Sequence, residues 1–215
     1  KSMNLDVVIA NKNIKKLITA VKKYEYTDAI VLVKSLPKEF NDIKKKNPEI
    51  TLGVLFEPKS LSDFDKLKKY KESAIILGKA TDEKLLRRIL EHKKINGFVG
   101  VEDGKKREHT HYRRSNMNQV LAKIAKENNK TYYVDFGMLL NSKKKSKLIG
   151  RVMQNVKFLR KYRAKMSIAS FSENENGIRL EDNLASVAKV LGVRKLTPVS
   201  IPQKEILPKG VRIVG

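Results

Sequence analysis

The chain has 215 residues, with 47 Lys and Arg against 23 Asp and Glu, so its formal net charge is 47 − 23 = +24. The absence of cysteine excludes disulfide bonds and Cys-ligated zinc. No apolar run reaches the length of a membrane-spanning helix and no signal-peptide pattern is present, so we expect a cytoplasmic protein that does not bind membranes. The charge excess instead indicates a polyanionic partner, of which nucleic acid is the commonest.

Short apolar runs rich in β-branched residues recur along the chain. They cover residues 5–9, 29–33, 50–55, 74–77, 98–101, 132–136 and 166–169. Most are apolar at consecutive positions, which is typical of parallel strands buried on both faces.

Amphipathic helices are predicted between these runs. The expected core-facing residues of the first four are Ile14, Leu17, Ile18 and Val21; Phe40 and Ile43, after Pro37; Phe64 and Leu67, in a helix opening near Ser60 or Ser62; and Leu85, Leu86, Ile89 and Leu90, with Thr81 as N-cap.

The fifth predicted helix follows a basic loop. Ser115 is expected to cap it, because its hydroxyl can accept an amide hydrogen of the first turn. The expected core-facing residues are Met117, Val120, Leu121, Ile124 and Ala125. Arg113 and Arg114 lie beside the free amides of the helix start, and this combination predicts a phosphate-binding site.

Two further helices complete the pattern. The sixth runs from about 142 to 162 and faces inward through Leu148, Val152, Val156 and Leu159. The seventh faces inward through Leu184, Val187, Ala188 and Leu191 and ends at Gly192, a C′ glycine. The prolines that follow exclude a long final helix.

Repeated strand-then-helix units predict an α/β fold with a parallel sheet. A TIM-like (β/α)8 barrel with a degenerate eighth unit is favoured over an open doubly wound sheet, because the units are regular and no strand has the pattern of an edge strand. We expect one domain over residues 1–215, with 208–215 as a loose C-terminal tail.

A metal site is the alternative that an enzyme would require. His109 and His111, with Glu102 or Asp103, could ligate zinc or manganese, as in some barrel hydrolases. Apart from Asp135, the other expected strand ends supply few suitable ligands. The favoured interpretation is therefore two solvated loop histidines near RNA and no bound metal, with a metal-dependent phosphoesterase or hydrolase as the alternative.

Basic residues dominate the loops after the last expected strands. They include Lys105, Lys106, Arg107, Arg113 and Arg114 in one loop, Lys143, Lys144 and Lys145 in the next, and Arg179 before the seventh helix. Such loops are neighbours in a barrel, so their charges add into one field. The sequence therefore predicts a basic patch, within which Tyr112 could stack on a base.

A set of motifs recurs in a defined order between residues 111 and 192. They are His111-Tyr-Arg-Arg-Ser-Asn-Met-Asn-Gln-Val-Leu-Ala-Lys-Ile-Ala-Lys, Leu140-Asn-Ser, Gln154-Asn155, Lys161-Tyr162, Ile168-Ala-Ser, Ile178-Arg179, Asn183-Leu184-Ala-Ser and Leu191-Gly192. In order and spacing the chain resembles the archaeal ribonuclease P protein component 3 family, the barrel-fold subunit shared with the eukaryotic enzyme.

The resemblance implies an RNA-binding subunit of ribonuclease P, the ribonucleoprotein endonuclease that removes the 5′ leader of precursor tRNA. In that family the RNA subunit carries the chemistry with magnesium, so this chain is expected to be non-catalytic and to bind no cofactor. The implied partners are the ribonuclease P RNA, protein component 2 and, within the holoenzyme, precursor tRNA.

The resemblance also implies roles for individual residues. The motif positions carried over are Arg113, Arg114, Ser115, Asn118, Lys123, Lys126 and Arg179. The arginines and lysines are expected to bind RNA, together with Arg107, Lys143, Lys144 and Lys145 of the basic loops. His111, Ser115 and Asn118 are expected to shape the junction between loop and helix. A general nucleic-acid-binding barrel without a defined RNA is a third hypothesis.

Overall fold

The protein, in a computed structural model, is described over residues 5–10, 13–24, 26, 28–34, 45–47, 50–70, 74–80, 82–103 and 115–200. Within these residues one sheet of seven strands follows the chain order β1 to β7. The strands are β1 Leu5–Ile9, β2 Asp28–Val33, β3 Ile50–Phe56, β4 Ile75–Lys79, β5 Gly97–Val99, β6 Thr131–Asp135 and β7 Lys165–Ala169. Each pairs in parallel with the next, so the predicted parallel sheet is confirmed.

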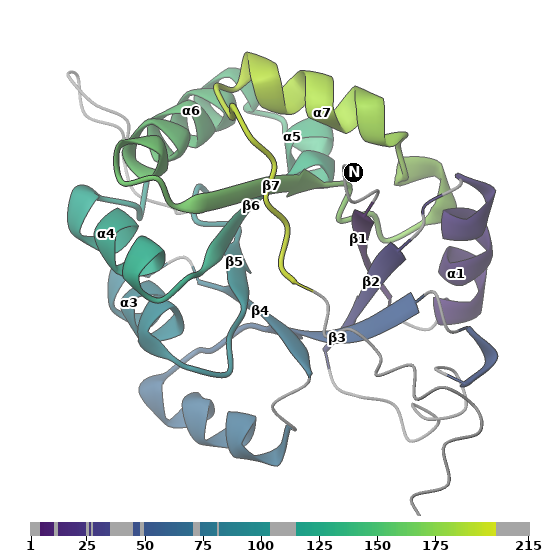
Figure 1. The fold of residues 1–215 in the computed structure, drawn as a ribbon, viewed down its shortest axis with the longest axis horizontal. Helices are drawn as coiled ribbons and strands as arrows, with labels where there is room; N and C mark the ends of the chain where they lie inside the picture. Colours follow the sequence, from purple (N-terminus) through teal and green to yellow (C-terminus); the bar gives the residue numbers. More distant parts are fainter. Residues whose placement is uncertain are drawn as a thin grey trace, which may run out of the picture.

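The sheet curves round until its last strand meets its first (Figure 1). The amide of Phe171 donates to the carbonyl of Val7 at 2.8 Å, and the amide of Ile9 donates to the carbonyl of Ser172 at 2.9 Å. An isolated parallel bridge joins Val8 to Ser172. The result is a nearly closed barrel, as predicted, and the alternative of an open doubly wound sheet is wrong.

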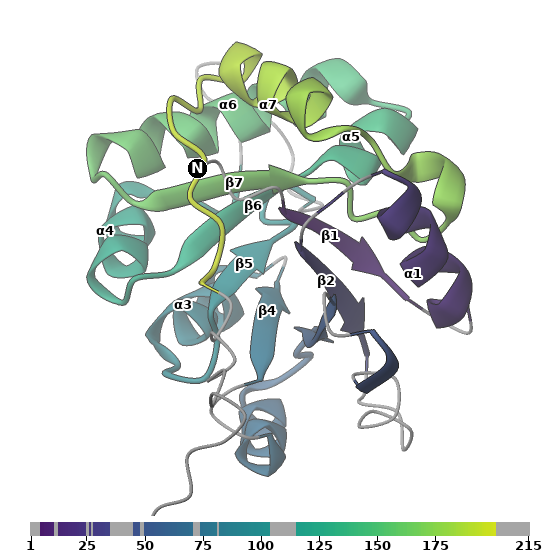
Figure 2. The ribbon, with the colours of Figure 1, turned by 45° about the vertical axis from the view of Figure 1, so that its right-hand side comes forward.

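Helices surround the barrel on its outer side (Figures 1 and 2). They are α1 Ile14–Lys23, α3 Glu83–Glu91, α4 Gln119–Glu127, α5 Phe136–Asn141, α6 Lys145–Lys161 and α7 Glu181–Val190, with the 3-10 helices η1 Leu61–Lys69 and η2 Glu175–Gly177. No helix in the described part of the chain is long and apolar enough to cross a membrane. The helix predicted around Phe40 and Ile43 lies outside the described residues.

Two of the early helix predictions need correction. The third helix is the 3-10 helix η1, in which Phe64 and Leu67 are buried as expected. Their i, i+3 spacing suits three residues per turn, which places both on one side. The cap of α3 is Asp82 and not Thr81, because the Asp82 carboxylate accepts the amides of Lys84 and Leu85 at 2.9 and 3.1 Å.

The predicted helix from 142 to 162 corresponds to α6, and a short helix that the sequence analysis did not predict precedes it. Phe136 does not end β6 but begins α5, and the Asp135 carboxylate caps this short helix by accepting the amide of Met138 at 2.7 Å. The second helix, α6, begins at Lys145. Its core-facing residues are those predicted, namely Leu148, Val152, Val156 and Leu159, all buried.

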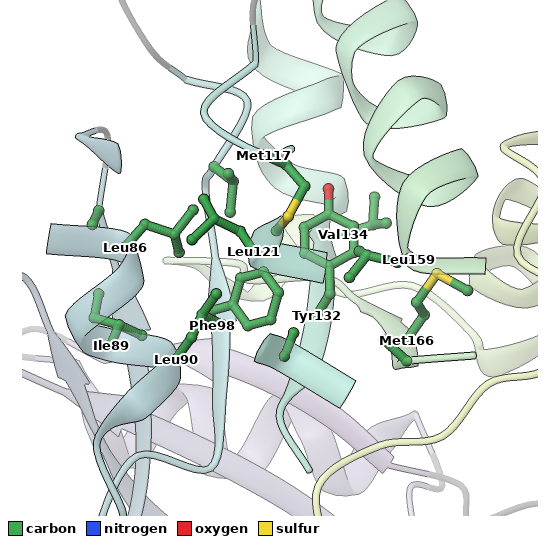
Figure 3. Close-up of a cluster of buried hydrophobic side chains, with 14 of the residues drawn as sticks. Leu86, Ile89, Leu90, Phe98, Met117, Leu121, Tyr132, Val134, Leu159 and Met166 are labelled. Carbon is green, nitrogen blue, oxygen red and sulfur yellow. The ribbon is translucent and has the colours of Figure 1, made fainter. Parts of the chain in front are cut away.

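Two apolar layers lie on the two sides of the sheet, because successive strand residues point to opposite faces. On β6, Tyr133 joins Val7, Leu32 and Leu77 inside the barrel, whereas Tyr132 belongs to the layer beneath the helices. Figure 3 shows this outer layer, with Leu86, Ile89 and Leu90 of α3 and Leu121 of α4 around Phe98 and Tyr132.

The chain after α7 does not form an eighth strand in its described part, residues 193–200. Gly192, with φ of +92°, ends the helix as predicted. The amide of Thr197 then donates to the carbonyl of Met166 at 2.7 Å, and the amide of Val199 donates to the Tyr133 hydroxyl at 3.0 Å. Buried Val199 therefore fills the barrel interior near the amino ends of the strands, which matches a degenerate eighth unit. The predicted tail, 208–215, lies outside the described residues.

Candidate nucleic-acid interface

The junction between β5 and α4 is the point at which the predicted site meets the described structure. Residues 104–114 lie outside the described part, and with them Arg107, His109, His111, Arg113 and Arg114. Their roles as RNA contacts or junction residues stay predictions. The segments on either side, ending at Asp103 and resuming at Ser115, are described.

The cap of α4 is Asn118 and not Ser115. The Asn118 side-chain oxygen accepts the amide of Leu121 at 2.9 Å, and its amide group donates to the Glu83 carboxylate of α3 at 2.7 Å. Ser115 acts three residues earlier, where its hydroxyl accepts the amide of Met117 at 3.1 Å. The prediction that Ser115 caps the helix is therefore wrong, and Ser115 and Asn118 both lie where the chain enters α4.

The later start of α4 also changes which residues face the core. Met117, Leu121 and Ala125 are buried as predicted, but Val120 is 61% exposed. Ala122 takes a core position in its place and is fully buried. The helix begins at Gln119, so Met117 precedes it and the predicted stripe had the wrong phase at its start.

Glu102, three residues after the end of β5, is fully buried in a polar network. Its carboxylate oxygen Oε2 accepts the Tyr132 hydroxyl at 3.0 Å and the side-chain amide of Asn155 at 3.4 Å. Its backbone carbonyl accepts an Arg151 guanidinium hydrogen at 2.8 Å. Burial raises the pKa of Glu102 to about 7, against the opposing effect of the hydrogen bond from Tyr132.

This position separates Glu102 from the barrel mouth. Glu102 lies on the helix side of the sheet with Tyr132, whereas Asp103 lines a cavity of about 550 Å³ at the carboxyl ends of the strands. The two carboxylates therefore face different spaces and cannot act as equivalent ligands of one site. Among the described residues, no group of three or more His, Asp or Glu could hold a metal ion.

The mouth cavity is acidic, although the chain as a whole is strongly basic. Among the residues that the structure describes, Asp103, Asp135 and Glu173 line it together with one ammonium group, that of Lys79. Lys79 also lies 3.7 Å from the Glu57 carboxylate. Burial raises the pKa of Asp135 to about 6. The described carboxylates at the mouth repel phosphate, so the described part of the cavity lining does not favour a polyanion.

The predicted RNA contacts that the structure describes are only partly brought together. Lys143 and Lys144 form the exposed turn before α6, and Lys145 opens that helix. The same helix holds Glu102 through Arg151 and Asn155, so these lysines lie on an element fixed to the junction.

Three of the predicted RNA contacts lie away from the junction between β5 and α4, namely Lys123, Lys126 and Arg179. Lys126 is in the last turn of α4, about 12 Å along the helix from Asn118 at 1.5 Å per residue. Lys123 lies 3.7 Å from the Glu127 carboxylate. The Arg179 guanidinium donates to the carbonyls of Asn176 and Ile178 at 2.7 and 2.8 Å.

The carbonyl of Arg179 accepts the hydroxyl of Tyr26. Tyr26 precedes β2 and so lies near the amino ends of the strands. Only the backbone carbonyl of Arg179 is near these amino ends, because its guanidinium lies against Asn176 of η2, which lines the mouth cavity. The charge of Arg179 therefore lies beside the segment after β7 and not at the junction between β5 and α4.

Sequence reasoning missed Glu102, Tyr132, Arg151 and Asn155 as a unit. One signal was present: Arg151 and Asn155 occupy positions beside Val152 and Val156 on the core-facing stripe of α6, where polar residues are unusual. A polar residue at a core position needs a buried partner, and the partner was not identifiable from spacing.

These features define a class of protein: a seven-stranded parallel β/α barrel with an acidic mouth and a buried polar junction behind β5. No family model matches the chain, and no curated protein matches its sequence.

Solved structures share the fold. A chain of the cryo-EM structure of archaeal ribonuclease P with mature tRNA has a TM-score of 0.73 and 20% identity, covering 86% of this chain and 82% of that chain. The histidinol phosphate phosphatase of Lactococcus lactis subsp. lactis, in complex with zinc, L-histidinol and phosphate, has a TM-score of 0.62 and 10% identity, covering 92% and 97%. At these identities the similarities establish a shared fold, which different functions can use.

Proposed function

We propose that the chain is an RNA-binding protein subunit of ribonuclease P and acts with protein component 2 to support the catalytic region of the RNA subunit. The observation that carries this proposal is the fold similarity, with a TM-score of 0.73, to a chain of archaeal ribonuclease P with mature tRNA. The ordered motifs between His111 and Gly192 support the same family.

The charge of the chain fits this role. Its net charge of +24 favours a polyanion, and each neutralised phosphate releases counterions. Arg107, Arg113, Arg114 and the exposed Lys143–Lys145 run are the proposed contacts on the side of the junction. Lys123, Lys126 and Arg179 are proposed as separate contacts, because they lie away from it.

The chemistry is assigned to the RNA with magnesium, and this chain supplies neither a catalytic residue nor a cofactor. In the cytoplasm its partners would be the ribonuclease P RNA, protein component 2 and precursor tRNA. His111, with Ser115 and Asn118, would set the path of the chain into α4.

Reconstitution tests the proposal. The chain is mixed with component 2, the ribonuclease P RNA and magnesium, and removal of the 5′ leader from precursor tRNA is measured with and without it. The chain is expected to stimulate cleavage, and an Arg113→Ala, Arg114→Ala variant is expected to lose most of the stimulation.

A matched control removes the same charge elsewhere. Arg194→Ala, Lys195→Ala takes two exposed cations from the segment after α7, near the amino ends of the strands. This variant is expected to stimulate the cleavage of precursor tRNA as much as the unmodified chain does. Equal activity of the Arg113, Arg114 variant and the unmodified chain would refute the assigned site, and absence of any stimulation would refute the function.

A metal-dependent phosphoesterase is the second candidate. The specific observation in its favour is the likeness in fold to histidinol phosphate phosphatase, a structure that contains zinc and phosphate. Retention of a stoichiometric transition metal by the purified chain would favour this candidate.

A further inference from the structure

A second cavity lies on the outer side of the barrel, away from the junction between β5 and α4. It has a volume of about 350 Å³ and lies between the ends of β2 and β3 and the 3-10 helix η1. In Figure 1, α3 lies between α4 and η1, the blue helix that follows β3. Part of the cavity wall is apolar, because Phe56 and Tyr70 belong to the layer beneath the helices. The cavity is therefore a separate site from that junction.

The lining of this cavity is basic, in contrast to the acidic mouth. Among the residues that the structure describes, its charged side chains are Lys34, Lys59, Lys66, Lys69, Glu57 and Asp63. Lysines outnumber carboxylates in this set, so the described lining carries an excess of positive charge.

The geometry of η1 places its charged residues in separate rows, because residues three apart in a 3-10 helix lie above one another. Asp63, Lys66 and Lys69 form the row along the cavity. Asp65 and Lys68 form a row that faces solvent, and there the Lys68 ammonium lies 2.8 Å from the Asp65 carboxylate. The outward lysine is thus paired with an acidic residue three positions away, and the cavity row can be examined for the same pairing.

The carboxylate of Asp63 is already engaged within the cavity row. It accepts the backbone amides of Lys59 and Ser60 at 2.8 and 3.0 Å, and the Lys66 ammonium at 2.6 Å. The bond from Lys66, followed by those from the two amides, holds the pKa of Asp63 well below its usual range. Asp63 therefore neutralises Lys66 and occupies the start of η1, so an anion in the cavity would have to bind to the other lysines.

Three lysines of the lining have no carboxylate partner in the described part of the chain: Lys34, Lys59 and Lys69. The Glu57 carboxylate lies 3.7 Å from the ammonium at the end of β4. The Lys69 ammonium lies 5.1 Å from the ring centroid of Tyr70, which forms part of the cavity wall. Like charges around one cavity repel each other, and a bound anion would offset this repulsion.

We propose that this cavity binds a phosphate group, held by the ammonium groups of Lys34, Lys59 and Lys69. Ammonium groups form charge-assisted hydrogen bonds with phosphate oxygens. The phosphate belongs either to the backbone of an RNA or to a small phosphorylated molecule, and the two sources share this chemistry. The proposal does not rest on the proposed function, because a phosphate group is the ligand in both cases.

Lysine acetylation followed by mass spectrometry tests the site in the unmodified chain. The acetylation rates of Lys34, Lys59 and Lys69 are measured without ligand, with inorganic phosphate and with ribonuclease P RNA, at constant ionic strength. The controls are Lys68 and Lys93, which are exposed and do not line the cavity. At a probe concentration about ten times its Kd, the rates of the three cavity lysines are expected to fall about tenfold, and those of the controls to change little.

A pair of variants with equal loss of charge provides a second measurement. Lys34→Gln, Lys69→Gln removes two exposed cations of the cavity, and Lys68→Gln, Lys93→Gln removes two exposed cations outside it. The first variant is expected to bind the protecting probe about tenfold more weakly than the unmodified chain, because charge-assisted bonds to phosphate are lost. The second variant is expected to bind that probe as the unmodified chain does.

The two probes also separate the two sources of phosphate. Protection of the cavity lysines by RNA alone would support a site for the RNA backbone, and protection by inorganic phosphate without protection by RNA would support a site for a small phosphorylated molecule. Protection by neither probe would overturn the phosphate site. Equal protection of Lys68 and Lys93, or equal affinities of the two variants, would show a general effect of charge and would overturn it as well.

Discussion

Ser170 connects the last strand of the barrel to Asp6 of the first: its hydroxyl donates to the Asp6 carboxylate at 2.6 Å and its amide donates to the other carboxylate oxygen at 2.8 Å. The amide of Val7 adds a third bond to Asp6 at 2.8 Å. β1 and β7 meet through an isolated bridge beyond the end of β7, so this side-chain connection reinforces the seam of the barrel.

Because Asp6 is buried at this seam, the stability of the folded chain is expected to depend on pH. Burial raises the pKa of Asp6 from 3.8 to about 6, and the bonds from Ser170 oppose the shift. The folded state therefore holds the proton more tightly than the unfolded chain. This contribution is fully present below pH 3.8 and is lost as the pH rises through 6, a change of about 3 kcal/mol.

Asp6→Asn removes this titration. The difference in unfolding free energy between the unmodified chain and the variant is expected to fall by about 3 kcal/mol from pH 3.5 to pH 7 in urea titrations. Asp182→Asn, at an exposed position on α7, controls for the loss of one carboxylate. If the difference in unfolding free energy between the unmodified chain and Asp6→Asn did not change with pH, the raised pKa of Asp6 would be contradicted.

Lys130 is a buried cation whose loss should destabilise the fold. It is 4% exposed, and its ammonium donates to the carbonyls of His92, at 2.7 Å, and Ile95. Lys130→Met keeps the stem and leaves both carbonyls without this donor, at an expected cost of about 2–3 kcal/mol in urea unfolding. Lys126→Met, exposed on the neighbouring helix, should change stability by less than about 0.5 kcal/mol. Equal stability of the two variants would disprove the structural role.

The cap of α4 can be tested by a single truncation. Asn118→Ala removes the bond to the amide of Leu121 and the bond to Glu83, and is expected to cost about 1–2 kcal/mol in thermal unfolding. Asn128→Ala, at the other end of the same helix, removes one exposed bond to Ile124 and should cost less. If Asn128→Ala lowered the stability more than Asn118→Ala, Asn118 would not be the cap of α4.

The exposed lysines before α6 predict a change in the salt dependence of RNA binding. Each phosphate contact contributes about −0.7 to −0.9 to the slope of log K against log salt. Replacing Lys143, Lys144 and Lys145 with Ala is expected to reduce the magnitude of that slope by about two. A triple variant of Lys189, Arg194 and Lys195, also exposed, is the control of equal charge. Equal slopes in the two variants would place the RNA away from Lys143–Lys145.

Metal removal separates the two candidate functions. Chain dialysed against EDTA is expected to keep its Tm and its stimulation of precursor tRNA cleavage once magnesium is restored. Elemental analysis before and after dialysis provides the measurement. A transition metal held in a 1:1 ratio, with a drop in Tm on its removal, would support the phosphoesterase instead.

The barrel could be predicted because it follows from local patterns. Consecutive apolar residues, as in 29–33, mark strands covered on both faces, and the 3.6-residue period of Leu148, Val152, Val156 and Leu159 marks a helix that packs against them. Capping is less determined by local sequence. Ser115 and Asn118 are both suitable caps, and the bond from Asn118 to Glu83 belongs to a neighbouring helix.

The sequence by itself determined the elements, their order and the excess of positive charge, because each depends on residues within a few positions or on composition alone. Only the tertiary structure decided the partners of the buried polar groups. Ser115 and Asn155 are 40 positions apart, and Asp6 and Ser170 are 164 apart. Such pairs depend on strand order, register and helix packing, since a hydrogen bond requires its two atoms to lie within about 3 Å.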